Sequence, residues 1–479
     1  MKKTKIVCTL GPSTTDEKTL EEMLRNGMNV ARLNFSHGSH EYHKKMIDTF
    51  RKVRDKLGYP AALLLDTKGP EIRLKTFKDG EAFLNDGQTF TLTSNDIEGN
   101  TEAVSVTYPD LARQLKKGDK VLIDDGRIKL VVESTTETDI ICTVINGGEI
   151  SNRKGVNTPN IHLDMIYLSE ADKKDLLFGI EEDVDFIAAS FVRCKEDVIS
   201  IRRFLDYNGG HGIKIISKIE NIEGIENFDA ILEHSDGIMV ARGDMGVEVE
   251  YERLPGLQKT FIRKCYSKGK MVITATQMLE SMIHNVTPTR AEITDVANAV
   301  FDGTSAVMLS GETAVGDHPP LVVSVMSKIA HQAEEDAEKL SLYGGMTYDN
   351  KNFEITNAVC DAACTTARDL NATAIIAVTK SGSTARRVSK FRPKEAIIGA
   401  TPDTKTFHQL SLSWGVQPVL ALDKDNAVDL LVHAIDCAKQ IDVVKNGDKV
   451  VIIYGVPLRT AGNTNTVRVQ IVDKSIYQW

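Results

Sequence analysis

Cysteine is scarce in this sequence, with seven residues among 479. The cysteines are scattered and no Cys-x-x-Cys pair occurs, so neither a disulfide framework nor a zinc site of the usual spacing is expected. Cys360 and Cys364 could share one face of a helix, but buried small side chains explain this spacing better than a metal site. This cysteine usage fits a reducing, cytoplasmic environment.

Long apolar runs and an excess of positive charge are also missing. No run of about 18 apolar residues occurs, so no membrane-spanning helix is expected. The apolar N-terminal stretch stops at Gly11-Pro12, too early for a signal peptide. With 58 basic and 67 acidic residues, the net charge of −9 argues against a dedicated nucleic-acid binder. The apolar content of 42% is that of a globular protein, and the length predicts more than one domain.

Short, β-rich apolar runs alternate with helical stretches such as Asp16–Asn26 and Tyr251–Lys268. This alternation is typical of parallel strands joined by helices, and eight such runs predict a closed (β/α)8 TIM barrel, which belongs to the α/β class. We assign residues 1–69 and 167–340 to this barrel. The predicted strands are Lys5–Thr9, Asn29–Leu33, Ala61–Asp66, Asp185–Ser190, Lys214–Ile219, Gly237–Ala241, Met271–Thr274 and Ser305–Leu309.

The stretch between the third and fourth barrel strands has a different pattern. Alternating strands such as Lys120–Ile123 and Lys129–Val132 are separated by turn pairs such as Asp125-Gly126. This predicts an all-β domain, residues 70–166, inserted in a barrel loop. Because loops at this end of a barrel carry function, the insertion is expected to act as a lid.

A polar, glycine-containing link after Leu342 opens a third unit, residues 341–479, in which strands again alternate with helices. We predict a small doubly wound α/β domain. Its predicted strands are Ala374–Thr379, Ala396–Ala400, Val416–Leu420, Lys449–Tyr454 and Thr466–Val472. The first strand leads into the loop Thr379-Lys380-Ser381-Gly382-Ser383-Thr384 and a helix that is expected to begin near Ala385. Hydroxyls and backbone N–H groups at a helix N-terminus can bind an anion, but a plain helix cap by Ser383 or Thr384 explains the loop about as well.

Polar side chains follow most of the predicted barrel strands at their carboxyl ends, where active sites of such barrels lie. Lys218 and Glu220 are two residues apart and point the same way, and Asp244 follows the next strand. Two carboxylates can hold Mg²⁺, and a lysine beside them can stabilise a transferring phosphoryl group. One Lys-x-Glu pair alone is more often a solvated face, but the whole set predicts an active site. The other strand-end residues are Arg32, Asn34 and Ser36 (on one face if extended), His37 (or a helix cap), Asp66, Thr67, Gly243, Thr276 and Glu312.

Long motifs throughout the chain resemble those of the pyruvate kinase family. These motifs are TKIVCTLGP from Thr4, RLNFSHG from Arg32, DTKGPEIR from Asp66, ISKIEN from Ile216, ARGDMG from Ala241, ATQMLESM from Ala275 and MLSGETA from Met308. The resemblance covers essentially the whole chain. It implies transfer of the phosphoryl group of phosphoenolpyruvate to ADP, giving ATP and pyruvate. It also suggests a bacterial type of homotetramer, without an additional N-terminal segment or C-terminal domain.

The resemblance further implies roles for single residues. For catalysis these are Lys218 at the transition state, Arg32 on the phosphate, Thr276 near the protonating relay, and Gly243, Asp244 and Thr276 on the substrate. For cations they are Glu220 and Asp244 for Mg²⁺ (or Mn²⁺), and Asn34, Ser36, Asp66 and Thr67 for K⁺, with Glu71 typical of members that need K⁺. For ADP or ATP they are Asn34, His37, Arg73 and Lys154, the last in a stretch that departs from the family pattern at Thr158 and Asn160. The loop Thr379–Thr384 is similar to the sugar-phosphate effector site of the family, and the facing loop Pro457–Asn463 is less diagnostic.

Two other functions remain open at this point. One is a barrel aldolase or lyase that uses a metal enolate, or a Schiff base on Lys218. The carboxylates near Lys218 should keep its pKa high, which disfavours a Schiff base. The other is a non-catalytic sugar-phosphate sensor, which is disfavoured because no strand-end residue of the motifs is missing.

Overall fold

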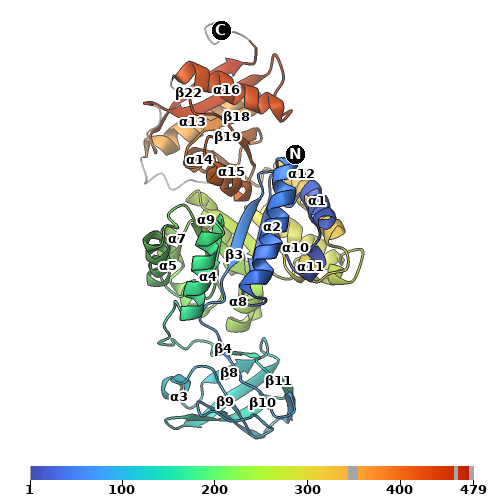
Figure 1. Cartoon of the computed structure of the whole chain (residues 1–479), viewed down its shortest axis with the longest axis vertical. Helices are drawn as coiled ribbons and strands as arrows, with labels where there is room; N and C mark the ends of the chain where they lie inside the picture. Colours follow the sequence, from blue (N-terminus) through green and yellow to red (C-terminus); the bar gives the residue numbers. More distant parts are fainter. Residues whose placement is uncertain (1, 344–353, 425, 458–461, 474–479) are drawn as a thin grey trace.

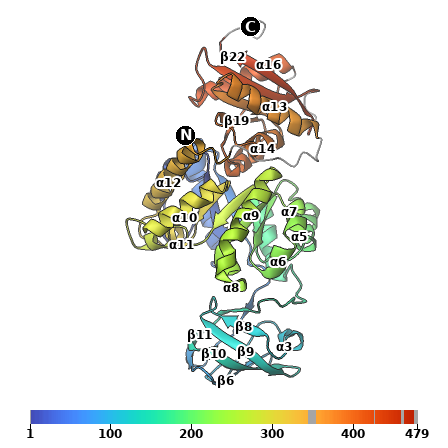
Figure 2. The same cartoon turned by 180° about the vertical axis from the view of Figure 1, so that it is seen from behind.

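The computed structural model describes residues 2–343, 354–424, 426–457 and 462–473. Three units follow one another along the long axis of the molecule (Figure 1). A β domain lies at one end, the barrel in the middle and an α/β domain at the other end, with the N-terminus beside the α/β domain. Figure 2 shows the same order from behind.

Eight parallel strands close the central barrel in the order β1-β17-β16-β15-β14-β13-β3-β2, as predicted. Their bounds are β1 Lys5–Thr9, β2 Val30–Asn34, β3 Ala62–Asp66, β13 Phe186–Ala189, β14 Lys214–Ile219, β15 Gly237–Ala241, β16 Met271–Ala275 and β17 Ala306–Leu309. The prediction was wrong for Ser36, which does not continue the extended face of Arg32 and Asn34. The chain turns after Asn34, whose Oδ1 accepts a hydrogen bond of 3.2 Å from the Ser36 N–H.

Helices surround the barrel, and their ends follow local sequence signals. The side chain of Asp16 accepts a hydrogen bond from the Thr19 N–H at the start of the first helix, and Gly27 ends it with a φ of 114°. Ser39 caps the second helix, so the alternative that His37 is the cap was wrong. These helices are α1 Glu17–Asn26, α2 His40–Leu57, α4 Glu170–Glu181, α5 Lys195–Tyr207, α6 Ile222–Glu226, α7 Phe228–His234, α8 Arg242–Glu248, α9 Leu254–Ser267, α10 Arg290–Phe301, α11 Gly311–Ala314 and α12 Pro319–Lys339, with 3₁₀ turns η1 Pro12–Thr14, η2 Tyr251–Arg253 and η3 Glu280–Ile283. In the part of the chain that the structure describes, no helix is both long and apolar enough to span a bilayer.

The β domain has a core of its own, in which Phe90, Leu92 and Val132 are fully buried. A seven-stranded sheet, in the order β4-β12-β8-β9-β10-β6-β7, packs with the pair β11-β5. The strands are β4 Ile72–Arg73, β5 Glu81–Leu84, β6 Thr89–Thr93, β7 Ala103–Ser105, β8 Lys120–Ile123, β9 Ile128–Thr135, β10 Asp139–Asn146, β11 Gly148–Ser151 and β12 Gly155–Asn157, with helix α3 Leu111–Gln114. Near the barrel, β4 and β12 pair antiparallel, with Arg73 opposite Gly155. The limits 70–166 remain a prediction.

The third unit contains a five-stranded sheet in the order β20-β19-β18-β21-β22, in which only β22 is antiparallel to its neighbour among the described strands. Its elements are α13 Ile355–Asp369, β18 Ala374–Val378, α14 Ser383–Lys390, β19 Ala396–Thr401, α15 Thr404–Gln409, η4 Leu410–Leu412, β20 Val416–Leu420, α16 Ala427–Gln440, β21 Lys449–Gly455 and β22 Thr464–Ile471. Helix α14 begins at Ser383, two residues before the predicted start near Ala385. The left-handed backbone of Gly382, with a φ of 77°, turns the chain into the helix there.

The C-terminal domain covers the amino-terminal end of the barrel. Leu412 is fully buried among the side chains that fill the barrel interior, such as Val7 and Met271. Beside it, the Lys5 ammonium donates a hydrogen bond of 2.6 Å to the Val416 carbonyl. The two domains therefore share one apolar core at this end of the barrel.

Lys5 should make stability depend on pH. Burial, reinforced by the charge of Lys2, lowers the pKa of Lys5 from 10.5 to about 7. Between these values the unfolded chain binds one proton more than the folded protein, so stability rises with pH by about 1.4 kcal/mol per unit. We expect the melting temperature to rise less between pH 7 and 9 in Lys5→Met than in the unchanged protein. Thermal denaturation checks this, with the exposed Lys18→Met as control, and equal rises in all three proteins would contradict it.

Candidate active site

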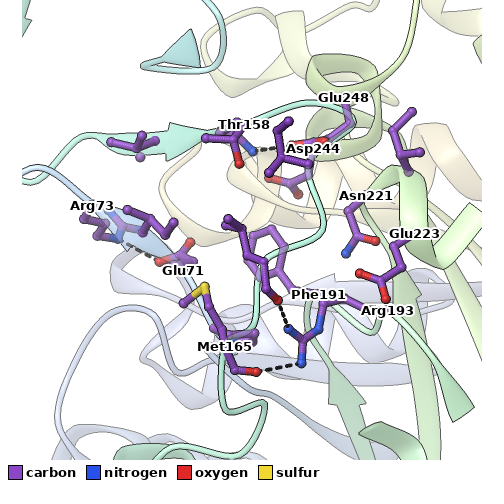
Figure 3. A pocket seen from close by; sticks show the side chains of 18 of the residues that line it. Glu71, Arg73, Thr158, Met165, Phe191, Arg193, Asn221, Glu223, Asp244 and Glu248 are labelled. Carbon is purple, nitrogen blue, oxygen red and sulfur yellow. Dashed lines mark hydrogen bonds and ion pairs between the residues drawn. The ribbon is translucent and has the colours of Figure 1, made fainter. Parts of the chain in front are cut away.

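A cavity of about 520 Å³ opens between the carboxyl ends of the barrel strands and the β domain. His37, Arg73 and Lys154, three of the predicted nucleotide contacts, line it. Asn34, the fourth, is not among the described residues of its wall. Figure 3 shows Glu71 and Arg73 paired along the wall, and Asp244 reaching in from α8. The cavity thus lies between the predicted lid and the predicted catalytic face.

Beside this cavity, charged side chains from three strands form a buried cluster. The Lys218 ammonium lies 3.1 Å from Asp66 Oδ1 and 2.9 Å from Glu220 Oε1. Arg32 binds the other oxygen of Asp66, with Nε 2.6 Å from Oδ2. All four side chains are buried. Two cations and two carboxylates therefore face one another where a substrate phosphate could meet the cations.

The charge states of Asp66 and Lys218 support each other. Burial alone would raise the pKa of Asp66, but the charges of Arg32 and Lys218 outweigh it and hold the pKa below its usual value. Burial would likewise lower the pKa of Lys218, but Asp66 and Glu220 outweigh it and raise the pKa above its usual value. Lys218 therefore stays an ammonium, able to donate to a phosphoryl oxygen but not to act as a free amine.

Glu220 and Asp244, the predicted Mg²⁺ ligands, are less well compensated. Burial raises the pKa of Glu220 to about 8; Lys218 opposes this shift and the Asp244 charge adds to it. Burial, with a contribution from Asp244, also raises the pKa values of Asp125 and Glu248 on the same cavity wall. Within the described chain, the Asp244 carboxylate has no hydrogen-bond or ion-pair partner. Such an excess of negative charge fits a divalent cation.

The number of ligands also fits Mg²⁺. No cluster of three or more His, Cys, Asp or Glu side chains able to hold a metal occurs among the residues that the structure describes. Mg²⁺ usually takes only one or two protein carboxylates and keeps positions for water and for phosphate oxygens. Glu220 is held in place by the Phe191 N–H, which donates a hydrogen bond of 2.6 Å to Oε2. The pair therefore suits a shared site for cation and substrate better than a closed structural site.

The residues predicted to bind K⁺ lie at the ends of neighbouring strands. Asn34 on β2 is in register with Asp66 on β3, and Thr67 follows directly. The Thr67 hydroxyl donates to the Ala188 carbonyl over 3.3 Å. Their oxygen donors suit a hard monovalent cation, although both oxygens of Asp66 already face Arg32 or Lys218.

Thr276 has a strained backbone, with a φ of 71°, which is rare for a β-branched residue. Arg242 supports this turn: its Nη2 donates a hydrogen bond of 2.6 Å to the Thr276 carbonyl, and its Nη1 lies 2.6 Å from Asp295. The Thr276 hydroxyl accepts a hydrogen bond of 2.8 Å from the Gly243 N–H and donates one of 2.6 Å to the Ala275 carbonyl. Strain of this kind marks functional sites. In this state the hydroxyl proton points to the backbone, so a relay through Thr276 needs a rotation or a water molecule.

Some site residues were missed from the sequence. The Ser190 hydroxyl accepts a hydrogen bond of 2.7 Å from the Lys218 ammonium and donates one of 2.6 Å to the Thr67 carbonyl. It ends the predicted fourth strand, so the rule applied to the other strand ends would have found it. Arg193 donates to the carbonyls of Leu163 (3.1 Å) and Met165 (3.0 Å), and so holds one connection of the β domain against the barrel. No sequence signal marked this role.

Glu312, in contrast, does not serve the site. Its fully buried carboxylate accepts hydrogen bonds from the backbone N–H groups of Leu279 (3.1 Å) and Ser310 (2.6 Å). Glu312 therefore ties the loop after β16 to the start of α11. A polar residue after a strand can thus be structural.

The predicted effector loop borders a second cavity, of about 90 Å³, in the C-terminal domain. Its described wall contains Thr379, Lys380, Ser381, Ser383 and Thr384, together with Gly462 and Asn463 of the facing loop. Residues 458–461 of that loop lie outside the described residues. The alternative of a side-chain cap was wrong, because Gly382 is the N-cap residue and the Thr384 hydroxyl contacts that of Thr464 at 2.7 Å.

Comparison with known proteins agrees with this architecture. Residues 1–323 match the family model "Pyruvate kinase, barrel domain", and residues 357–470 match "Pyruvate kinase, alpha/beta domain". The chain is 47% identical over 478 residues to a pyruvate kinase of Clostridium acetobutylicum, covering 99% of this chain and 100% of the relative. It is 48% identical over 480 residues to one of Staphylococcus haemolyticus, covering 99% and 81%.

A solved structure gives the same result. The crystal structure of a pyruvate kinase from Cryptosporidium parvum matches with a TM-score of 0.93 and 39% identity, over 98% of this chain and 96% of that one. The fold, both family models and the full-length identity agree, and we conclude that the chain belongs to the pyruvate kinase family and is a phosphotransferase.

Proposed function

We propose that this chain transfers the phosphoryl group of phosphoenolpyruvate to ADP, giving ATP and, after protonation of the enolate, pyruvate. The observation that carries the proposal is the buried Lys218 ammonium, which lies 3.1 Å from Asp66 and 2.9 Å from Glu220 beside Arg32. Two fixed cations at one point of a barrel mouth suit a group that bears several negative charges.

In the transfer, the bond between phosphorus and the enol oxygen breaks while a terminal phosphate oxygen of ADP forms a bond to phosphorus. Arg32 would hold the phosphate through the guanidinium N–H groups that are not engaged by Asp66 or by the Thr9 hydroxyl. Lys218, kept protonated by its carboxylates, would donate to the phosphoryl oxygens as charge moves onto them. Both cations are positioned before substrate arrives, so little reorganisation is needed.

The departing enolate must then gain a proton at its methylene carbon. Thr276 directly follows β16, and Asp244 lies on α8, which follows the neighbouring strand β15. The Thr276 hydroxyl is held by the Gly243 N–H. A hydroxyl is a poor acid alone, so we assign Thr276 to positioning a water molecule that delivers the proton. Gly243 and Asp244 would hold the carboxylate and phosphate end of the substrate, the latter through the cation.

Glu220 and Asp244 would hold Mg²⁺ or Mn²⁺, and Asn34, Ser36, Asp66 and Thr67 would hold K⁺. When bound, these cations would offset the negative charge of the two phosphorylated substrates.

The nucleotide would lie between Arg73, Lys154 and His37. Arg73 is now paired with Glu71 at 2.7 Å and Lys154 with Asp124 at 2.8 Å, so nucleotide phosphates would exchange for these carboxylates. Closure of the β domain would then exclude water from the transfer.

A coupled assay with phosphoenolpyruvate, ADP, Mg²⁺ and K⁺ tests the reaction. Pyruvate should form only when all four are present, and ATP should form in equal amount. No turnover of the folded protein under these conditions would overturn the proposal. Trapping of Lys218 by borohydride in the presence of a ketoacid would instead favour the Schiff-base alternative, which requires a neutral amine.

The monovalent-cation site gives a prediction of its own. Replacing K⁺ by Li⁺ at constant ionic strength should lower kcat roughly tenfold or more, because the smaller ion cannot contact all the oxygens of the site without distorting it. Steady-state rates with tetramethylammonium as the inert control measure the effect. Equal rates with K⁺ and Li⁺ would contradict the assignment of Asn34, Asp66 and Thr67.

The loop from Thr379 to Thr384 would bind a sugar phosphate and regulate the enzyme. Its support is the cavity beside Lys380, Ser381 and the α14 N-terminus, where a phosphate can meet a cation, hydroxyls and N–H groups. We also keep the expectations of a homotetramer and a cytoplasmic location, which rest on the family resemblance and the cysteine usage.

For this effector loop, Lys380→Ala combined with Ser381→Ala should weaken binding of a hexose bisphosphate roughly tenfold or more. Calorimetry measures the affinity. Lys445→Ala, an exposed change in the same domain outside this cavity, should leave it unchanged. Unaltered binding in the double variant would remove the site.

A further inference from the structure

A further cavity, of about 600 Å³, lies at the opposite end of the barrel from the catalytic mouth. We call it the floor cavity. Its walls are the end of α9, the loop before β15 and helix α14 of the C-terminal domain. Figures 1 and 2 both show α14 over this end of the barrel, near α9. The volume lies in the range of ordinary small-molecule sites.

Positive charge dominates this wall. Lys268 and Lys270 come from the barrel, and Arg386, Arg387 and Lys390 from α14, against three acidic side chains. Glu354 and Arg387 pair with each other, and Asp236 lies 3.1 Å from Lys214, outside the cavity wall. Lys270 donates to the carbonyls of Leu232, Glu233 and Ser235, so positive charge still exceeds negative charge on the wall. The charge of this wall therefore favours binding of an anion and disfavours binding of a metal cation.

The cations of this wall also repel one another. Burial lowers the pKa of Arg386, and the neighbouring charge of Arg387 lowers it further, against the opposing effect of Asp236. The pKa of Lys390 is lowered by burial and by Arg387. A bound anion would relieve both the lost hydration and the repulsion. Hydroxyls of Ser267 and Ser383 are on the same wall and could complete its hydrogen bonds.

Arg386 joins the floor cavity to the effector loop. Its Nη2 donates a hydrogen bond of 2.8 Å to the Ser381 carbonyl. Its guanidinium lies over Gly382 so closely that a Cβ there would be 2.5 Å from Nη1. Ser383 lines both cavities. A ligand that attracts the guanidinium from one side must therefore act on the loop at the other.

We propose that the floor cavity is a second anion site, for a phosphate-bearing small molecule, and that Arg386 couples it to the effector loop. The binding part stands on the floor cavity alone. The coupling part rests on the proposed function of the loop Thr379–Thr384.

Calorimetry with inorganic pyrophosphate, on the full chain without divalent cations, tests the binding part. We expect Lys268→Ala combined with Lys390→Ala to weaken one pyrophosphate site at least tenfold, while Lys380→Ala combined with Ser381→Ala keeps that site, since the Ser381 carbonyl remains. The matched control, Arg263→Ala with Lys45→Ala, removes two exposed cations outside the cavity and should bind like the unchanged protein. Circular dichroism verifies that each variant is folded. Lys268→Glu, a single change at an exposed side chain, provides a second test.

The floor site would be overturned if the affinity and stoichiometry of pyrophosphate binding were unchanged in Lys268→Ala/Lys390→Ala and in Lys268→Glu. The cavity would then be a solvent-filled crevice. Loss of all pyrophosphate binding in Lys380→Ala/Ser381→Ala would overturn it too, because the anion would then sit at the effector loop. If no sugar phosphate binds but the floor variants still lose pyrophosphate, the effector proposal fails and the floor site stands.

The coupling part needs a second titration. Saturating pyrophosphate should change the hexose bisphosphate affinity by roughly fivefold in the unchanged protein, and this change should vanish in Arg386→Ala. Sugar-phosphate binding that ignores pyrophosphate, or a shift that persists in Arg386→Ala, would refute the coupling.

Discussion

Replacing Lys218 by methionine is expected to lower kcat for phosphoryl transfer roughly 1,000-fold or more, while exchange of the methyl protons of pyruvate stays measurable. Methionine keeps most of the volume but removes the ammonium that would stabilise the transferring group. Proton exchange needs the enolate site and Thr276, not the phosphoryl group, so it should survive. Coupled kinetics and deuterium exchange followed by NMR measure the two reactions on the same sample.

Lys214→Met is the matched control, because Lys214 lies on the same strand but at its other end, where it pairs with Asp236 at 3.1 Å. It should leave both reactions close to those of the unchanged protein. Equal losses of transfer and exchange in Lys218→Met would contradict the assigned role, since they would indicate a collapse of the whole site. Asp66 retains Arg32 in the variant, which limits such a collapse.

Glu220→Gln and Asp244→Asn should each weaken binding of a divalent cation roughly 100-fold or more and reduce turnover accordingly. Each change keeps the shape of the side chain and removes one of the two negative charges on the cation. Mn²⁺ binding, measured by electron paramagnetic resonance in the absence of substrates, reports the loss independently of activity.

The control for these variants is Glu226→Gln, an exposed carboxylate on α6 a short distance along the chain. It should bind Mn²⁺ like the unchanged protein. If Glu220→Gln bound Mn²⁺ with full affinity and still lost activity, Glu220 would act by holding Lys218, 2.9 Å away, rather than the cation.

Much of the barrel could be predicted because its strands are buried on both faces. Residues such as Ile238, Met239 and Val240 form a continuous apolar run that ends before a charged residue, Arg242, and each predicted strand end lies within one residue of the observed one. The end of β2 was harder to predict, because the chain turns where Asn34 Oδ1 accepts a hydrogen bond from the Ser36 N–H. A hydrogen bond between a side chain and the backbone leaves no periodic pattern in the sequence.

The site was predictable where strand ends carry its residues, as with Lys218, Glu220 and Asp66. It was less predictable where a side chain acts through a distant backbone group. Arg193 reaches the carbonyl of Met165, and only the fold brings them together. The floor cavity had no signal for the same reason, because Lys268 and Lys390 come from two domains and meet only after both have folded.

Leu412 has a consequence for how this architecture can be divided. A TIM barrel is often regarded as an autonomous module, but here the Leu412 side chain of the neighbouring domain packs into the amino-terminal end of the barrel core. A barrel fragment without that domain would expose apolar side chains such as Val7 and Met271 to water, which would destabilise the barrel. When C-terminal domains are exchanged between relatives, the incoming domain must therefore provide an apolar side chain at the position of Leu412. Side-chain packing between the two domains, and not the end of the last barrel element, therefore decides where the barrel can be separated.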